Sequence, residues 1–155
     1  MVIEIPGRDS LHIKNIVLDF NGTLANNGII SEEAKNILKE LAGYYELFVL
    51  TADTYGNAAE ACSGLPVVLK TFPNERAGAH KLEVIEELNS EHCACVGNGY
   101  NDINMFSKAA LTIGVLGEEG ICGKLVQNSD IIVNSIEDGL ELFLDTKKIT
   151  ATLRA

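Results

Sequence analysis

Six short apolar runs, separated by segments with helical spacing or turn signals, constrain the fold of this chain most strongly. They cover residues 16–18, 47–50, 67–69, 93–96, 111–115 and 131–133. Runs that are apolar at nearly every position are typical of strands buried on both faces, and such strands alternate with helices in parallel sheets. The sequence therefore predicts an α/β fold, a three-layer Rossmann-like domain with a central, mostly parallel sheet and helices on both faces.

The clearest helix is predicted to begin after Ser31, a suitable N-cap that is followed by Glu32 and Glu33 in the first turn. Its apolar face would consist of Ala34, Ile37, Leu38 and Leu41. A second helical pattern covers 79–89, with Leu82, Ile85 and Leu88 at helical spacing. Further helices are expected after residue 51, from 101, from 121 and over 136–144.

The opening segment differs from the rest because residues 2–5 and 11–13 flank a Pro-Gly-containing turn. This pattern predicts a β-hairpin, which we expect to be an antiparallel addition at the edge of the sheet. The 155 residues contain no repeat or linker, so we expect a single domain over 1–155. Its parts would be the hairpin addition 1–14, the core 15–144 and a C-terminal tail 145–155.

The net charge of −10 and the pI of about 4.7 exclude some classes of partner. An acidic surface repels nucleic acid and anionic lipid, so we expect neither nucleic acid nor membrane as a partner. No apolar run approaches the roughly 18 residues of a membrane span, and no signal peptide is recognisable, so we expect a cytoplasmic protein. The four cysteines form no CxxC pair and are expected to be reduced core residues.

Polar residues whose side chains can take part in catalysis or binding follow the predicted strands. Asp19 follows the first strand, Thr51 the second, and the loop 97–102 the fourth, while Lys81 is expected to open the helix before that fourth strand. Ligands of doubly wound sheets bind at the carboxyl ends of the strands. We therefore expect the side chains of Asp19, Thr51, Lys81, Asn98 and Asp102 to surround one pocket.

These residue types suit phosphoryl transfer. A carboxylate can attack phosphorus and form an aspartyl-phosphate, and a hydroxyl and a lysine can hold the phosphoryl oxygens. Oxygen ligands suit Mg²⁺, and the glycines at 22, 97 and 99 allow close approach of the backbone to phosphate or metal.

Four ordered motifs resemble those of the haloacid dehalogenase (HAD)-like superfamily: Asp19-Phe20-Asn21-Gly22-Thr23-Leu24, Thr51, Lys81 and the loop Gly97-Asn98-Gly99-Tyr100-Asn101-Asp102. The details are most similar to the phosphorylation domain of P-type ATPases and its soluble relatives, in which Thr-Gly-Asp stands where this chain has Thr51-Ala52-Asp53. The resemblance covers about residues 14–144. It implies a Mg²⁺-dependent phosphatase or phosphoryl-transfer domain.

The resemblance also implies a metal site. Asp19 would be both nucleophile and metal ligand, the backbone carbonyl of Asn21 a second ligand, and Asn98 the third. Asp102 would belong to the same metal site, acting on Lys81 or on a metal-bound water. The cofactor would be Mg²⁺.

The phosphoryl group would be bound by Thr51, Ala52, Lys81 and Gly22, according to the same resemblance. The substrate would be a phosphorylated small molecule or protein. The segments between the motifs leave no room for a cap domain, so the crevice would be open, with 26–28 as the tip of a short flap. Open sites need a macromolecular substrate or a neighbouring subunit to exclude water, which makes a homo-oligomer a reasonable expectation.

Two positions depart from the family pattern. Hydrolytic members have Asp two residues after the nucleophile as general acid and base, whereas this chain has Asn21, which cannot transfer a proton. The family also usually has Asp where this chain has Asn98, so weaker metal binding is expected. We therefore expect a slow phosphatase or a phosphoryl carrier, and Asp53 remains open as a substitute base.

The two asparagines also fit a second class of function. The alternative is a catalytically impaired HAD-fold binding or regulatory module, in which the two asparagines have disabled the metal chemistry. A response-regulator receiver is disfavoured because no acidic pair precedes Asp19. A dinucleotide site is disfavoured because Asp102 stands where GxGxxG requires its third glycine.

Overall fold

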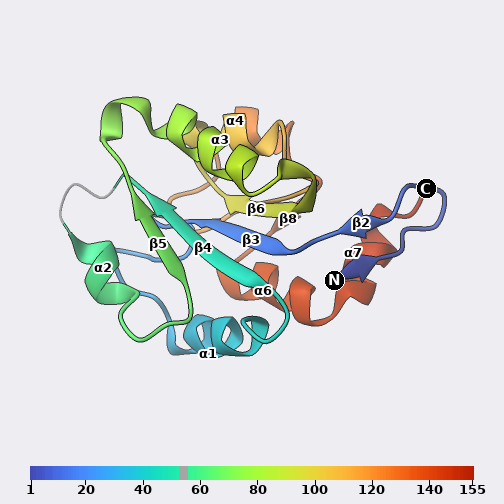
Figure 1. Ribbon diagram of the computed structural model, residues 1–155, viewed down its shortest axis with the longest axis horizontal. Coiled ribbons are helices and arrows are strands. Elements are labelled where there is room, and N and C mark those ends of the chain that lie inside the picture. The colour runs from blue at the N-terminus through green and yellow to red at the C-terminus, as the bar shows by residue number, and fades with distance from the viewer. Residues whose placement is uncertain (53–55) are drawn as a thin grey trace.

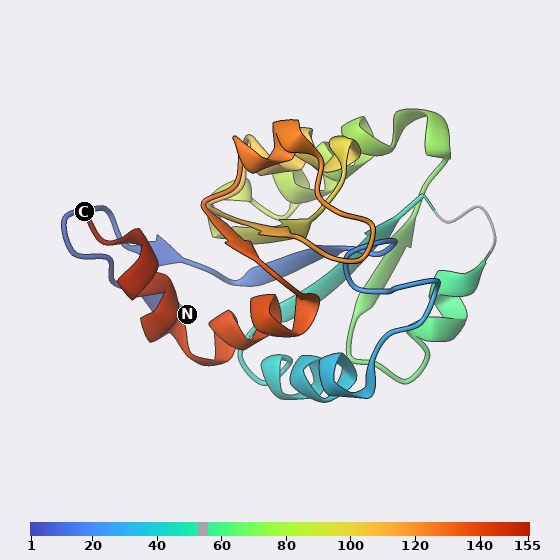
Figure 2. The same ribbon diagram turned by 180° about the vertical axis from the view of Figure 1, so that it is seen from behind.

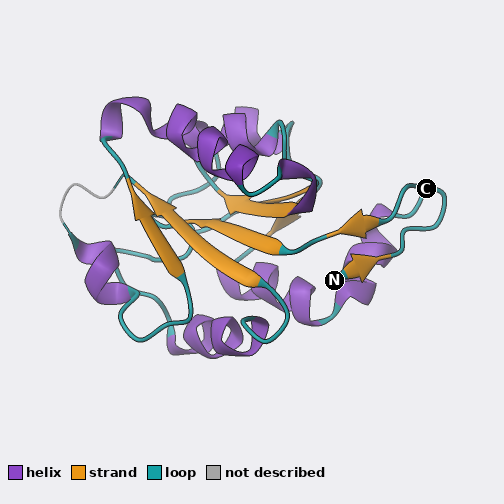
Figure 3. Ribbon diagram, viewed as in Figure 1, coloured by secondary structure: helices purple, strands orange, loops and turns teal. Residues whose placement is uncertain are grey.

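The computed structural model describes residues 1–52 and 56–155. Figure 1 shows the chain, and Figure 3 shows its helices and strands. The strands are β1 (Val2–Ile3), β2 (Leu11–His12), β3 (Asn15–Asp19), β4 (Glu46–Thr51), β5 (Val68–Thr71), β6 (Cys93–Gly97), β7 (Leu111–Val115) and β8 (Ile131–Val133). The α-helices are α1 (Glu32–Leu41), α2 (Asn57–Ala61), α3 (Ala77–Glu87), α4 (Ile103–Phe106), α5 (Gly123–Val126), α6 (Ile136–Leu144) and α7 (Thr146–Leu153). Short 3₁₀ turns are η1 (Asn74–Arg76), η2 (Ser90–His92) and η3 (Tyr100–Asp102).

All six predicted core strands form one sheet, and every pairing in it is parallel. The strand order is β5-β4-β3-β6-β7-β8. The order reverses between β3 and β6, because the chain first builds outward from β3 to β5 and then starts again on the other side. This is the switch point at which doubly wound sheets bind ligands. The predicted α/β Rossmann-like architecture is confirmed.

Successive residues of the strands face opposite sides of the sheet and build two cores. In β3, Ile16 and Leu18 pack toward α1 and α6, whereas Val17 packs toward α3, α4 and α5. Figure 2 shows the same two helical layers from behind. Both faces are therefore covered, which explains why the central strands are apolar at nearly every interior position.

The helix after Ser31 forms as predicted. The Ser31 hydroxyl accepts a hydrogen bond of 3.1 Å from the Ala34 amide, and the four predicted apolar residues of α1 are buried. Helix α3 differs from the prediction because it begins at Ala77, so that Lys81 lies inside the helix rather than at its start. Its buried face consists of Ala77, Lys81, Val84 and Ile85.

The N-terminal hairpin is present, but it is not an edge addition to the main sheet. β1 and β2 pair antiparallel only with each other and form a separate two-stranded sheet. The segment expected as a tail contains α7, which packs against this hairpin: the Thr150 hydroxyl donates to the Glu4 carbonyl at 2.9 Å, and the Ala155 amide donates to the Pro6 carbonyl at 3.0 Å. Both chain ends therefore lie together on one side of the molecule (Figure 1).

The connections on the ligand-binding side of the sheet are short. A loop and α1 join β3 to β4, and α2 is the helix between β4 and β5. No cap domain is inserted among the residues that the structure describes. In the same part of the chain, no helix is long and apolar enough to cross a membrane.

Candidate active site

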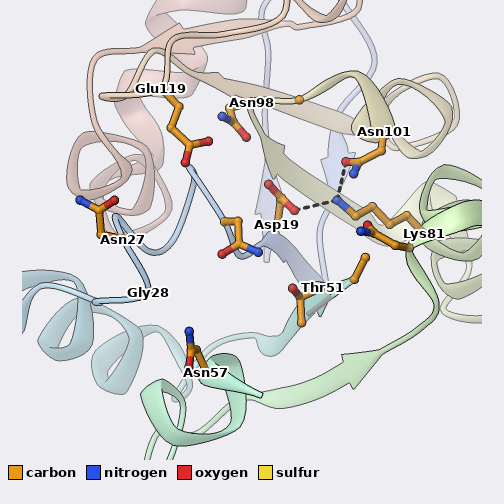
Figure 4. Close-up of a pocket in the computed structure, with 13 residues that line it drawn as sticks. Asp19, Asn27, Gly28, Thr51, Asn57, Lys81, Asn98, Asn101 and Glu119 are labelled. Atoms are coloured by element: carbon orange, nitrogen blue, oxygen red, sulfur yellow. Dashed lines mark hydrogen bonds and ion pairs between the residues drawn. The ribbon is translucent and has the colours of Figure 1, made fainter. Parts of the chain in front are cut away.

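A pocket of about 520 Å³ lies at the carboxyl ends of β3, β4 and β6 (Figure 4). Of the predicted residues, Asp19, Asn21, Thr51, Ala52, Lys81 and Asn98 line it. Further described residues of its lining are Asn27, Gly28, Asn57, Asn74, Gly99, Asn101 and Glu119. The structure thus brings together most of the residues singled out in the sequence.

Lys81 is the centre of the buried part of this site. Its side chain comes from the middle of α3 and is only 1 % exposed. The ammonium nitrogen lies 2.7 Å from Asp19 Oδ1, 2.7 Å from Asp102 Oδ1 and 2.8 Å from Asn101 Oδ1. All three donors of the ammonium therefore have an acceptor. Burial alone would lower the pKa of Lys81, but the carboxylates of Asp19 and Asp102 outweigh burial and raise it.

Asp102 lies behind Lys81 rather than in the pocket wall. It is fully buried, and its Oδ1 accepts from Lys81 while its Oδ2 accepts from the backbone amides of Asn98 and Gly99 at 3.1 and 3.0 Å. These contacts support the expected action of Asp102 on Lys81 and leave neither carboxylate oxygen facing the pocket. Asp102 also fixes the turn that carries Asn98.

Asp19 is the last residue of β3 and is 7 % exposed. Its pKa is raised to about 7, first by burial and then by the nearby charge of Asp102, and Lys81 and Thr23 only partly offset these two effects. Such a shift means that ionisation of this carboxyl group costs more free energy in the folded protein than in water. A bound cation would relieve that cost.

Two oxygens beside Asp19 suit a divalent cation. The Thr23 hydroxyl is 3.1 Å from Asp19 Oδ2 and 3.0 Å from Asn98 Oδ1, so a carboxylate oxygen and an amide oxygen both lie within hydrogen-bond distance of this one donor. A carboxylate, an amide oxygen and the carbonyl of Asn21 are hard oxygen donors of the kind that Mg²⁺ prefers. Among the described residues, no three His, Cys, Asp or Glu side chains converge on one point, so this donor set is poor in charge.

Glu119 was not recognised in the sequence. It follows β7 in a loop with no distinctive motif, yet its carboxylate lies in the pocket next to the residues of the Asp19 loop (Figure 4). A Cβ added to Gly22 would collide with the Glu119 carboxylate and would lie 2.7 Å from Asn98 Nδ2. Gly22 also has a φ of +73°, so this position requires glycine both for its conformation and for space.

Three of the four predicted phosphate-binding residues line the pocket, and Gly22 does not. Thr51 is 2 % exposed at the end of β4, and both it and Ala52 line the pocket. Gly22 does not line it, and its amide donates to the Ala25 carbonyl at 2.9 Å. In this structure Gly22 therefore packs closely against Asn98 and Glu119 and does not face the phosphate position. Asp53, considered as a substitute base, lies outside the described residues.

The predicted flap forms a tight turn at the pocket edge. Asn26 and Ile29 exchange two backbone hydrogen bonds of 3.0 Å, and Asn27 and Gly28 between them have φ values of 51° and 77°. Two positive φ values in a two-residue loop characterise a type I′ turn, which Asn-Gly favours. Asn27 and Gly28 line the pocket, as the flap hypothesis requires.

No protein-family model matches the chain, but one curated protein and several solved structures are similar to it. Protein MJ0073 of Methanocaldococcus jannaschii, which is uncharacterised, is 40% identical over 78 residues, a match that covers 48% of this chain and 84% of MJ0073.

The similar solved structures include proteins assigned to the HAD hydrolases, such as that of Legionella pneumophila (TM-score 0.72 at 14% identity, over 92% of this chain and 87% of the other), and phosphatases. The 3-deoxy-D-manno-octulosonate 8-phosphate phosphatase of Moraxella catarrhalis, solved with magnesium, phosphate and KDO, has a TM-score of 0.73 at 18% identity over 90% of each chain. The cobalt-bound phosphatase for the same substrate from Haemophilus influenzae has a TM-score of 0.72 at 11% identity, over 93% of this chain and 94% of the other. The chain therefore has the fold of the HAD-like superfamily and belongs to one sequence family with MJ0073.

Proposed function

We propose that this protein is a Mg²⁺-dependent phosphatase or phosphoryl-transfer enzyme that forms an aspartyl-phosphate on Asp19. The observation that carries the proposal is the buried Lys81 ammonium, 2.7 Å from both Asp19 and Asp102, at the switch point of the sheet. Burying a lysine between two carboxylates carries a desolvation cost, and charged groups in such environments cluster at functional sites. Phosphoryl transfer needs such a fixed cation next to its nucleophile.

The residues present fit a magnesium ion. Asp19 Oδ2, Asn98 Oδ1 and the Asn21 carbonyl would hold it, and when bound it would neutralise charge on the phosphoryl oxygens. Among the described residues that line the pocket, Lys81 is the only cation, whereas Asp19 and Glu119 are anions. A phosphate group therefore needs a further positive charge in order to enter. The magnesium and phosphate in the M. catarrhalis phosphatase are consistent with this requirement.

The first step follows from the positions of Asp19, Lys81 and Thr51. A carboxylate oxygen of Asp19 attacks phosphorus, the bond from phosphorus to the leaving oxygen breaks, and that oxygen departs with the electron pair. Lys81 and the Thr51 hydroxyl stabilise the equatorial oxygens as charge spreads over them. Because Lys81 already has three acceptors, it exchanges one of them, such as Asn101, for a phosphoryl oxygen.

The leaving group must depart without a proton from residue 21. Asn21 lines the pocket but has no transferable proton at neutral pH. Acyl and aryl phosphates have leaving groups that are stable as anions, so they are the substrates that suit this site. In the second step water attacks the aspartyl-phosphate, releases inorganic phosphate and regenerates Asp19, and this step also lacks a positioned base at residue 21.

The physiological substrate is a phosphorylated small molecule or protein that enters an uncapped pocket, and a neighbouring copy of the chain would shield that pocket from water. The test of the function is hydrolysis of acetyl phosphate and p-nitrophenyl phosphate with Mg²⁺ and with EDTA, beside Asp19→Asn. We expect slow, Mg²⁺-dependent release of phosphate that Asp19→Asn abolishes. Equal release by the two proteins would overturn the assignment of Asp19.

A second candidate function is a binding or regulatory module without turnover. It is favoured by the two asparagines, Asn21 and Asn98, that line the pocket where the family pattern has aspartates. Beryllium fluoride with Mg²⁺ mimics an aspartyl-phosphate and separates the two candidates. Thermal stabilisation that depends on Asp19 supports the enzyme, whereas no shift at millimolar Mg²⁺ supports the module.

A further inference from the structure

We propose that Glu119 supplies the negative charge that Asn98 lacks, and that Asn98 and Glu119 act as a matched pair in the divalent-cation site. This inference rests on the proposed function, since it concerns the same metal site. It assigns a role to a residue that no motif marks.

The loop after β7 presents Glu119 to the pocket. The Gly120 amide donates to the Gly117 carbonyl at 2.9 Å, and Gly120 has a φ of +78°, so residues 117–120 form a tight turn. Glu118 and Glu119 occupy its two central positions. Glu119 lines the active-site pocket, whereas Glu118 lines a separate surface depression. The turn therefore separates two adjacent carboxylates, and the Glu119 carboxylate lies in the pocket that Asp19 also lines (Figure 4).

Asn98 holds this turn at two points. Its side-chain nitrogen donates to the Gly120 carbonyl at 3.4 Å, and its backbone carbonyl accepts from the Cys122 amide at 2.8 Å. An aspartate at position 98 has no N–H with which to make the first of these bonds. Its charge would also stand against the Glu119 carboxylate, because both side chains lie close to the same point above Gly22. The amide at 98 is thus the residue that fits a loop carrying Glu119.

The remaining side of the amide faces the metal position. Asn98 Oδ1 lies 3.0 Å from the Thr23 hydroxyl, which is also 3.1 Å from Asp19 Oδ2. Asn98 therefore offers a neutral oxygen to the cation and keeps its nitrogen for the Gly120 loop. Asp19 is the only other carboxylate among the described residues of the pocket lining. With Glu119 the site has two negative charges for a divalent cation, and without it only one.

The experiment measures cation binding directly rather than turnover. Thermal unfolding of the full chain is followed during titration with MgCl₂, with NaCl at matched ionic strength as the blank. Glu119→Gln removes the charge and keeps the shape, and Glu118→Gln is the matched control because it removes the neighbouring charge from the same turn. We expect Glu119→Gln to raise the Mg²⁺ concentration for half-maximal stabilisation about tenfold, and Glu118→Gln to leave it unchanged.

A rescue variant separates a charge effect from a damaged loop. Asn98→Asp in the Glu119→Gln background returns one carboxylate to the site without the clash of two, so it should restore most of the lost Mg²⁺ affinity. Equal half-maximal concentrations for Glu119→Gln and Glu118→Gln, with clear Mg²⁺ stabilisation of the wild type, would overturn the role of Glu119 and leave the proposed function intact. Failure of Asn98→Asp to rescue would overturn the matched pair, and absence of Mg²⁺ stabilisation in the wild type would overturn both proposals.

Discussion

Lys81 Nζ lies 2.7 Å from Asp19 Oδ1 in a position where the lysine is 1 % exposed and the aspartate 7 %. The same ammonium is 2.7 Å from the fully buried Asp102. One cation therefore compensates two carboxylates that repel each other. Solvent contributes little to this balance, so the stability of the fold and the ionisation of Asp19 depend on the same three side chains.

The first prediction concerns removal of this cation. Lys81→Met keeps the apolar stem of the side chain and leaves Asp19 and Asp102 without a counter-charge. Breaking a buried ion pair by removing one partner costs about 3–5 kcal/mol, so we expect a loss of that order in the free energy of urea unfolding at pH 8. The control is Lys35→Met, which removes a lysine that pairs with the exposed Glu32 at 3.1 Å and should cost less than about 1 kcal/mol. Equal losses in the two variants would contradict the central role of Lys81.

The second prediction concerns pH. The pKa of Asp19 is raised to about 7 from an ordinary value of 3.8, so between these values the folded protein keeps a proton that the unfolded chain releases. The stability of the metal-free protein should therefore fall as pH rises from about 4 to 7. Asp19→Asn removes this dependence. We expect the variant to be more stable than the wild type by roughly 2–4 kcal/mol at pH 8, since each unit of pKa shift corresponds to about 1.4 kcal/mol.

This difference between Asp19→Asn and the wild type should shrink toward pH 4, where Asp19 is protonated in the folded protein. Chemical unfolding in EDTA at several pH values measures it. Asp9→Asn, in the exposed turn of the hairpin, is the control and should keep the pH dependence of the wild type. A stability difference between Asp19→Asn and the wild type that stays constant across the pH range would show that the pKa of Asp19 is not raised in the folded protein.

The strands and the position of most site residues follow from local patterns. Continuously apolar strands predict a parallel sheet, and the strand ends then place Asp19, Thr51 and Asn98 at one edge without any knowledge of long-range contacts. The predicted start of α3 was wrong for a physical reason. The sequence places Lys81 at the beginning of the helix, whereas α3 begins at Ala77 and the ion pairs with Asp19 and Asp102 hold Lys81 on its buried face.

The position of Glu119 in the pocket could not be predicted from local sequence patterns. Its place in the pocket depends on how the turn 117–120 packs over Gly22, a contact between loops almost a hundred residues apart in the chain. No periodicity encodes such a contact. Similarly, the separate hairpin has a packing partner in α7, which contacts β1 and bonds to the hairpin loop through Thr150 and Glu4, a contact between chain ends that no local pattern encodes.

The third prediction concerns Gly97, the last residue of β6. A Cβ at this position would lie 2.5 Å from Asp102 Oδ2, the oxygen that holds the amides of Asn98 and Gly99. Gly97→Ala should therefore displace Asp102, cost about 1–3 kcal/mol in unfolding experiments and lower turnover. Gly123→Ala is the matched control, because nothing lies within 4 Å of its added Cβ and the position is helical. It should be neutral or slightly stabilising.

The fourth prediction concerns the missing proton donor. Asn21→Asp places a carboxyl group two residues after Asp19, the proposed nucleophile, in the lining of the same pocket. A positioned general acid or base contributes about 10²–10⁴-fold to rate, so turnover should rise by up to this factor. The rise should be larger for an alkyl phosphate than for p-nitrophenyl phosphate, because the alkoxide leaving group depends more on protonation. Asn57→Asp adds the same charge elsewhere in the pocket lining and controls for electrostatics alone. If both variants change turnover equally for both substrates, proton transfer at residue 21 is not what limits this site.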